Sequence, residues 1–206
     1  MKILPDEPKS LGNPDERAAR LARVDEPHVL LLNQLVRRIR REVGLEREVP
    51  YFDPDDGGID ARCLFLLEAP GPRAVASGFV SRNNPDETAK NFLLLNREAG
   101  LDRTLTVSWN IIPWYIGTGS KIRPARSDDI AEALPYLESL LASLPRLHVA
   151  VLVGRKAQRA EPCVHQQAPN VDVVHMLHPS PLVLNTNKAA RTAVLGMLKQ
   201  VTAMIA

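Results

Sequence analysis

The chain has 206 residues, of which 45% are hydrophobic, a formal net charge of +2 and only two cysteines. This length fits one domain with a substantial core. The two sulfurs exclude a disulfide framework and a four-thiolate metal cluster, and no stretch is apolar for long enough to span a bilayer. The first residues lack the apolar core of a signal peptide, so we expect a soluble cytoplasmic protein. The small positive charge is compatible with nucleic acid binding but does not by itself argue for it.

Residues 1–25 are rich in Pro, Asp, Glu and Arg and are predicted to form an N-terminal arm with one short helix over 14–23. From Pro27 to Val43, apolar residues recur at helical spacing, which predicts an amphipathic helix that ends at Gly44. Four arginines lie mostly on its other face: Arg37, Arg38, Arg40 and Arg41. They either contact phosphate or form a solvated face, and the second role is the commoner one.

An acidic loop, Tyr51 to Gly58, precedes the first predicted strand. Calcium binding there is disfavoured because the loop lacks the ligand spacing and the distal glutamate of an EF-hand. The apolar run 63–67 predicts a buried strand of a parallel sheet. This strand ends at Glu68, and the Pro-Gly-Pro turn at 70–72 forces the chain out of the sheet.

Helices and strands alternate over the rest of the chain. Asn84 and Pro85 are predicted to start a helix that ends at Gly100. The later predicted elements are a strand over 104–109, a helix from 128 that follows Ser127 and kinks at Pro135, strands over 147–153 and 171–177, and a helix over 188–205. This alternation predicts an α/β fold with three αβα layers around a mainly four-stranded parallel sheet.

Three predicted strands end in a polar residue that can do chemistry: Glu68, Asn110 and His178. The carboxyl ends of parallel strands lie at one edge of a sheet, so the three side chains are expected to line one crevice. Glu68 can position water or stabilise positive charge, Asn110 matches an amide-like edge, and neutral His178 can donate to an anionic leaving group. Taken singly, Asn110 can simply cap a turn and His178 can satisfy a carbonyl. The three together favour a site.

Other interpretations of the polar residues are weaker. Cys163, His165, His175 and His178 are metal-ligand types, but their spacing matches no common zinc pattern, so we expect no metal. Phe79 lies in a predicted loop and is either a stacking platform or part of the core. A small α/β hydrolase unrelated to DNA is disfavoured because the chain lacks a Gly-x-Ser-x-Gly motif.

Two motifs resemble those of the uracil-DNA glycosylase superfamily: Glu68-Ala69-Pro70-Gly71 and His178-Pro179-Ser180-Pro181, with Asn110 between them. The likeness runs from about Leu64 onward. The first motif looks most like the thermophilic-type iron–sulfur branch, whose four cysteines this chain lacks. The resemblance implies a single uracil-DNA glycosylase-like domain over residues 1–206. It also implies a DNA repair enzyme that hydrolyses the N-glycosidic bond of flipped uracil and leaves an abasic site, with no cofactor.

The resemblance also implies roles for individual residues. Glu68 would activate water or stabilise the sugar cation, His178 would donate to the base oxygen, Asn110 would read the Watson–Crick edge, and Phe79 would stack on the base. Ala69 and Gly71 would also contact the base. They stand where the most familiar members carry an aspartate and a tyrosine. Loss of the aspartate shifts its task to Glu68, Asn83 or Asn84, and loss of the tyrosine favours a range of bases wider than uracil.

The segment 182–184 resembles the loop that wedges into the duplex, although ordinary packing explains each leucine equally well. Ser180, Leu182 and Leu184 are therefore expected to contact DNA. The expected phosphate contacts are Lys121, Arg123, Arg155, Lys156, Lys188 and Arg191.

Since the site motifs contain no lysine nucleophile, we expect no lyase activity. The expected partner is uracil-containing DNA, and the expected state is a monomer in the bacterial cytoplasm, acting at the nucleoid. The alternative is a catalytically silent member of the fold that binds DNA or a protein, which would have little reason to keep Glu68, Asn110 and His178 together.

Overall fold

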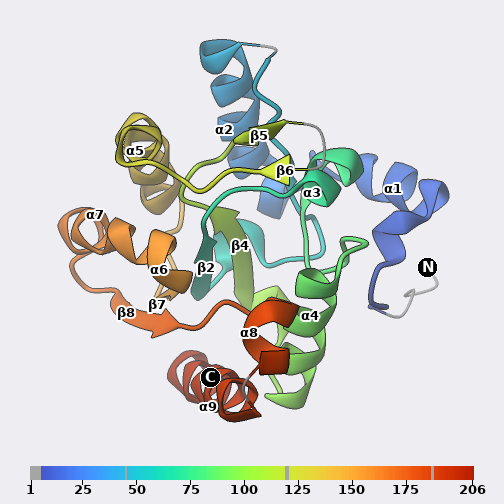
Figure 1. The fold of residues 1–206 in the computed structure, drawn as a ribbon. Coiled ribbons are helices and arrows are strands. Elements are labelled where there is room, and N and C mark those ends of the chain that lie inside the picture. Colours follow the sequence, from blue (N-terminus) through green and yellow to red (C-terminus); the bar gives the residue numbers. More distant parts are fainter. Residues whose placement is uncertain (1–5, 45, 119–120, 187) are drawn as a thin grey trace.

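Four parallel strands form the central sheet of the computed structural model, which describes residues 6–44, 46–118, 121–186 and 188–206 (Figure 1). The strands are β2 (Cys63–Leu67), β4 (Thr106–Asn110), β7 (Val149–Val153) and β8 (Asp172–Met176). Their spatial order is β4-β2-β7-β8, and every pairing is parallel. The chain therefore runs from β2 to β4 and then crosses back to β7, which places the reversal of strand order beside β2. The predicted four-stranded parallel sheet is confirmed.

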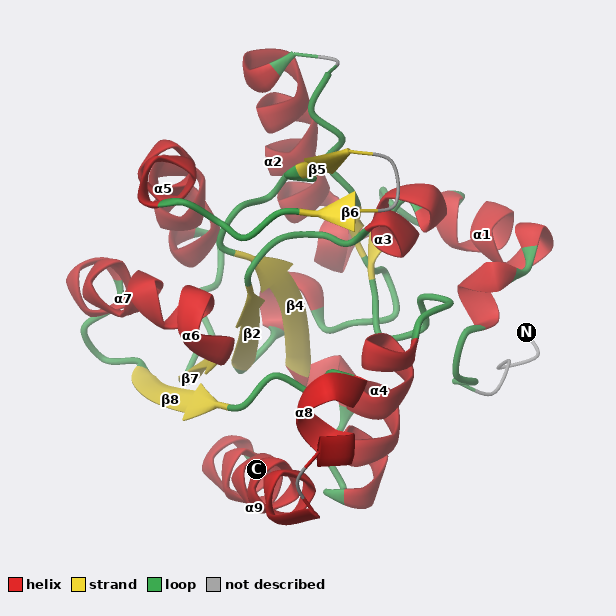
Figure 2. Cartoon of the chain, viewed as in Figure 1, coloured by secondary structure: helices red, strands yellow, loops and turns green. Residues whose placement is uncertain are grey.

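Helices cover both faces of the sheet (Figure 2). Helices α2 (Pro27–Val43), α5 (Ser127–Ala142) and α7 (Glu161–Gln167) share a core with one face of the strands. Helices α4 (Glu87–Glu98) and α9 (Lys188–Ile205) share a second core with the other face. Successive residues of a strand point to opposite faces, so the two central strands, β2 and β7, contribute to both cores and have continuous apolar sequences. The three-layer αβα architecture is confirmed.

Short elements connect these layers. They are α1 (Pro14–Leu21), β1 (Tyr51–Phe52), α3 (Pro72–Ser77), β3 (Phe79–Val80), β5 (Gly117–Thr118), β6 (Lys121–Ile122), α6 (Gly154–Ala157) and α8 (Pro181–Thr186). Four 3-10 turns lie at Ser10–Gly12, Gly58–Asp60, Arg103–Leu105 and Gln158–Ala160. Within the described residues, no helix combines the length and the apolar character needed to cross a membrane.

The start of α4 differs from the prediction. Asp86, not Asn84, caps the helix, and its side chain accepts a hydrogen bond of 2.9 Å from the backbone N–H of Ala89. Asn84 is buried, and its amide donates to the carbonyl of Phe79 at 2.9 Å. An asparagine followed by proline has the sequence signature of a cap, but Asn84 is used to hold the preceding loop.

The N-terminal segment packs against the domain. Leu11 is fully buried, and its N–H donates to the carbonyl of Asn83 at 3.1 Å. Arg20 of α1 is buried against Asp53, with a distance of 2.6 Å between its guanidinium and the carboxylate. The expected helix over 14–23 is present as α1, but the described part of this segment is docked rather than extended as an arm.

The acidic loop supplies carboxylates to a buried cluster of charges. Arg103 donates to Asp53 at 2.6 Å and to Asp56 at 2.8 Å, and Arg82 lies 3.5 Å from Asp56. Burial would raise the pKa of Asp53, but the guanidinium groups of Arg103 and Arg20 hold that pKa well below its usual range. Burial wins at Asp56 and raises its pKa. The loop aspartates are thus partners of arginines, and within the described residues no group of three or more acidic, His or Cys side chains could hold a metal.

Replacing Asp53 tests how much this cluster of buried charges contributes to the free energy of unfolding. Asp53→Asn leaves Arg20 and Arg103 short of a buried counter-charge, so we expect the free energy of unfolding to fall by about 3–5 kcal/mol. Asp25→Asn is the matched control because Asp25 and Arg37 form an ion pair at the surface, where solvent screens the charges. Urea unfolding of the three proteins measures the difference. Equal stabilities of the two variants would contradict a structural role for the buried cluster.

Candidate functional site

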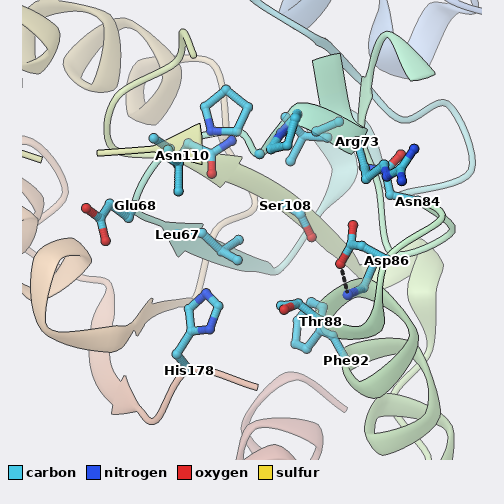
Figure 3. Close-up of a pocket in the computed structure, with 18 of the residues that line it drawn as sticks. Leu67, Glu68, Arg73, Asn84, Asp86, Thr88, Phe92, Ser108, Asn110 and His178 are labelled. Carbon is cyan, nitrogen blue, oxygen red and sulfur yellow. Dashed lines mark hydrogen bonds between the residues drawn. The ribbon is translucent and has the colours of Figure 1, made fainter. Parts of the chain in front are cut away.

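A cavity of about 580 Å³ opens at the carboxyl ends of β2 and β4 (Figure 3). It is bounded by the segment after β2, the inner face of β4, the start of α4, and the turn that contains His178. Its volume is typical of sites for small organic ligands. Glu68, Asn110 and His178 all line it, so the structure brings together the three strand-end residues that the sequence singled out.

Strand pairing determines where two of these residues lie. Leu67 is the register partner of Asn110, which puts Glu68 and Asn110 at neighbouring strand ends. One carboxylate oxygen of Glu68 accepts a hydrogen bond of 2.7 Å from the N–H of Ala125. The carbonyl of Ala125 in turn accepts a bond of 2.6 Å from the ammonium of Lys156. Glu68 is therefore held in a defined orientation by a backbone segment that Lys156 anchors from its other side.

Asn110 is 4% exposed, and its side-chain nitrogen has no hydrogen-bond partner among the described residues. A buried donor without an acceptor costs about 1–3 kcal/mol, so such groups are rare in native structures. Because Asn110 lines the cavity, a ligand with a carbonyl group can supply the acceptor. An amide in this position is able to bind an amide-like edge of a ligand.

His178 comes shortly after the end of β8 and packs against Gly154. Gly154 has φ +81°, a conformation that favours glycine, and a Cβ atom there would lie 3.5 Å from the Cβ of His178. Burial lowers the pKa of His178, although the carboxylates of Glu68 and Asp86 oppose the effect. The imidazole is therefore neutral at neutral pH, and it keeps one N–H to donate.

The lowered pKa of His178 predicts a pH dependence of stability. The unfolded state takes up a proton near the ordinary pKa of 6.5 and the folded state only at a lower pH. The stabilisation is therefore complete above pH 6.5 and is lost as the pH falls through the lower, folded value. His178→Gln should remove this part of the acid sensitivity, as measured by urea unfolding at several pH values between 7.5 and 5. His165→Gln, at an exposed histidine on α7, is the control. Parallel stability curves for wild type and His178→Gln would refute the assignment.

The other residues that were predicted to contact the base differ in whether they line the cavity. Ala69 and Gly71 line the cavity, and a Cβ atom built at Gly71 would meet no heavy atom of the described residues within 4 Å. Phe79 does not have the expected place, because it lies outside the cavity, 1% exposed, in a small core with Leu11 and Val24. Its strand β3 pairs with β1, which turns the ring into this core. Here the structure selects the core role that the sequence left open.

Asn83 and Asn84 hold the cavity wall together. Asn83 donates to Asp6 at 2.8 Å, and Asn84 accepts from Ser77 at 2.6 Å and donates to the carbonyl of Phe79. Both amides are thereby committed to the fold. Of the three candidates for the missing aspartate's task, Glu68 is the one with an ionisable group on the cavity.

The expected DNA-contacting residues are only partly placed at the surface. Arg155 is exposed after β7, and Leu182 is 77% exposed. The predicted wedge loop is helix α8, and Leu184 packs on the apolar core beside α9 because the helical turn directs it inward. Ser180 is half-buried, and its carbonyl accepts the N–H groups of Val183 and Leu184, both at 3.0 Å.

Several predicted phosphate ligands already have partners. Arg191 pairs with Glu98 of α4, Arg123 forms two bonds to Asp129 at 2.6 and 2.7 Å, and Lys156 binds the carbonyl of Ala125. The side chains of Lys121 and Lys188 lie outside the described part of the structure. Two of the residues with metal-ligand side chains, His165 and His175, both approach Glu161, at 3.5 and 3.0 Å.

Several cavity residues were not singled out in the sequence, among them Ser108 and Asp86. Ser108 lies two positions before Asn110 on β4, and Asp86 lines the cavity while it caps α4. Alternation along the strand would have placed Ser108 on the same face as Asn110. No local pattern separates Asp86 from an ordinary helix cap.

The cavity thus combines a carboxylate, a neutral imidazole and an amide whose nitrogen has no partner among the described residues, all at the carboxyl edge of a parallel sheet, where enzymes of this fold class commonly have their sites. The sequence model of the Uracil DNA glycosylase superfamily matches residues 54–201. Because this match spans most of the chain, the protein belongs to the uracil DNA glycosylase superfamily.

Two solved structures resemble this fold at low sequence identity. One is an NMR structure from Methanosarcina acetivorans, assigned provisionally as a uracil DNA glycosylase, with 15% identity, a TM-score of 0.49, and coverage of 69% of this chain and 91% of the other. The second is the crystal structure of a tyrosine-to-glycine mutant of UNG from Nitratifractor salsuginis, with 15% identity, a TM-score of 0.46, and coverage of 90% and 98%. No curated protein matches the chain.

Proposed function

We propose that this protein is a monofunctional DNA glycosylase that removes uracil from DNA. The observation that supports the proposal is that Glu68, Asn110 and His178 line one cavity. The buried amide nitrogen of Asn110 has no hydrogen-bond partner among the described residues. Uracil presents an N–H beside a carbonyl, and an asparagine amide can bind both. Such a base must first leave the stacked duplex to enter a cavity of this kind.

The chemistry follows from the charges on the site. As the N-glycosidic bond breaks, the base leaves with the bonding electrons as an anion, and the N–H of neutral His178 stabilises its oxygen. The sugar becomes positively charged, and the carboxylate of Glu68 stabilises this charge and orients a water molecule. Addition of this water at the sugar carbon and loss of a proton give an abasic site and free base. The protein acts as a monomer and needs no cofactor.

DNA would be positioned by groups around the mouth of the cavity. Arg73 lines the cavity and is exposed, and Arg155 is exposed after β7. Both can contact phosphates, which position DNA without reading its sequence. Leu182, exposed at the start of α8, can fill the stack that the flipped base vacates.

A catalytically silent relative that binds DNA or a protein is the second candidate. It predicts binding without turnover. The retained carboxylate and imidazole argue against it, because binding alone uses only the amide.

Cleavage of an end-labelled strand with a single uracil, followed by alkali, tests the proposal. The wild type should break the strand at the uracil, and Glu68→Gln, Asn110→Ala and His178→Ala should each lower the single-turnover rate by about 10²- to 10⁴-fold. His165→Ala, at a surface histidine, is the control and should keep the wild-type rate. A wild-type protein that binds the strand without cutting it would establish the silent alternative, and unchanged rates in all three variants would show that the site is wrongly assigned.

The wedge role of Leu182 gives a separate prediction. Leu182→Ala should slow cleavage of uracil in a duplex by about tenfold, because flipping a paired base costs a few kcal/mol that the side chain helps to offset. Cleavage in a single strand, where no partner base is left behind, should change less than about twofold. Leu31→Ala, at an exposed leucine of α2, is the control. Equal effects on both substrates would exclude the wedge.

A further inference from the structure

A second cavity lies directly beside the first. Its volume is about 390 Å³, which is within the range of sites for small organic ligands. Ile122 of β6 and the neighbouring Arg123 line both cavities, so this short segment is the partition between them. Ile122 is 46% exposed, although its side chain is apolar. A chain-like ligand that occupies the first cavity and continues past Ile122 therefore reaches the second.

An arginine stacked on a tryptophan forms part of the wall of the second cavity. The guanidinium of Arg47 lies over the ring of Trp114, 4.6 Å from its centre. Trp114 is 3% exposed and meets the ring of Tyr136 edge-on, so it is a fixed part of the core. Glu132 pairs with Arg47 as well, and the arginine side chain is still 36% exposed. A planar cation held in this way offers a flat surface on which a ring can stack.

The charges of the second cavity favour a neutral ligand. Both of its arginines already have carboxylate partners, Glu132 for Arg47 and Asp129 for Arg123. Asp129 itself lines the cavity, and the hydrogen bonds from Arg123 lower its pKa to about 2, so it stays ionised. A phosphate would be repelled by this carboxylate. A nucleobase is neutral and planar, and bases stack on guanidinium planes and aromatic rings.

We infer that the second cavity binds the base next to the flipped one when the DNA is single-stranded, with Arg47 as the stacking surface. This rests on the proposed glycosylase function, which places the flipped base in the first cavity. Ile122 then lies between two splayed bases of one strand. In a duplex the neighbouring base keeps its own pairing and stacking, so it does not enter the second cavity. Because every base has a flat face, the site accepts any neighbour.

Single strands in which a neighbour of uracil lacks its base test this inference. Three end-labelled strands carry one uracil with adenine on both sides, or with a tetrahydrofuran abasic residue on its 5′ or its 3′ side. Removal of the base from one of the two sides should lower the wild-type cleavage rate at subsaturating enzyme about tenfold, the effect of one stacked base. Arg47→Ala should cut the all-adenine strand about tenfold more slowly than the wild type and should no longer depend on the neighbouring base. Arg47→Lys keeps the charge without the flat surface and should behave as Arg47→Ala does.

Arg37→Ala is the matched control. Arg37 also pairs with a carboxylate, that of Asp25, and lies over a ring, that of Tyr51. It is not among the described residues that line either cavity, so this variant should keep the wild-type rates and the tenfold dependence. On a duplex with paired adenines beside the uracil, Arg47→Ala should stay within about twofold of the wild type, because the neighbouring base remains stacked.

Equal cleavage of all three strands by the wild type would overturn the inference, and so would an Arg47→Ala variant that slows all three by the same factor. Binding of the same strands, measured by fluorescence anisotropy, separates the two proposals. Binding that depends on the neighbouring base and on Arg47, without cleavage, would support the second site and refute the glycosylase function. Cleavage without dependence on the neighbour would refute the second site alone, and absence of both cleavage and binding would refute both proposals.

Discussion

The parallel pairing of β2 with β4 is the constraint on which the site depends. Leu67 opposite Asn110 brings two strand ends level, so that a carboxylate and an amide from residues 42 positions apart face one cavity. Parallel strands require long crossovers, and here the crossover contains α3, β3 and α4. The same connection that makes the parallel pairing possible therefore also builds the wall of the cavity. A slip of one residue in this register would turn Ser108 and Asn110 to the opposite face.

Buried ion pairs hold part of the cavity wall in place. Arg82 lines the cavity and is held by Thr106 and Asp56, and Arg103 ties Asp53 and Asp56 to Asp6 of the N-terminal segment. Charges in such a place are costly unless they are paired, and the acidic loop supplies the partners. The acidic residues that suggested a cation site in the sequence thus serve to fix a loop beside the cavity. This arrangement also explains why the N-terminal segment is docked.

Much of the fold and part of the site could be predicted from local patterns. The four core strands appear as short runs of apolar or β-branched and aromatic residues, and Glu68, Asn110 and His178 are recognisable because each follows such a run. Phe79 was harder to place, because an aromatic residue between glycine and valine is compatible with a pocket or a core, and the choice was made by the pairing of β3 with β1. The segment after Pro181 was expected to be a loop, but it forms α8, which buries Leu184 and leaves Leu182 outside. Among the basic residues, local sequence could not show that Arg123 and Arg191 already have carboxylate partners.

The sequence by itself determined the four core strands, the longer helices and the order of the chemical groups, because hydrophobic periodicity and turn residues act over a few neighbouring positions. Only the tertiary structure decided which of these groups meet. It placed Lys156 behind the backbone that holds Glu68, lowered the pKa of His178 by burial, and left Ser108 without a partner among the described residues while Thr106 on the same face of β4 found two. Burial and hydrogen bonding are properties of neighbours that are distant in the chain, so they depend on strand order and register rather than on local sequence.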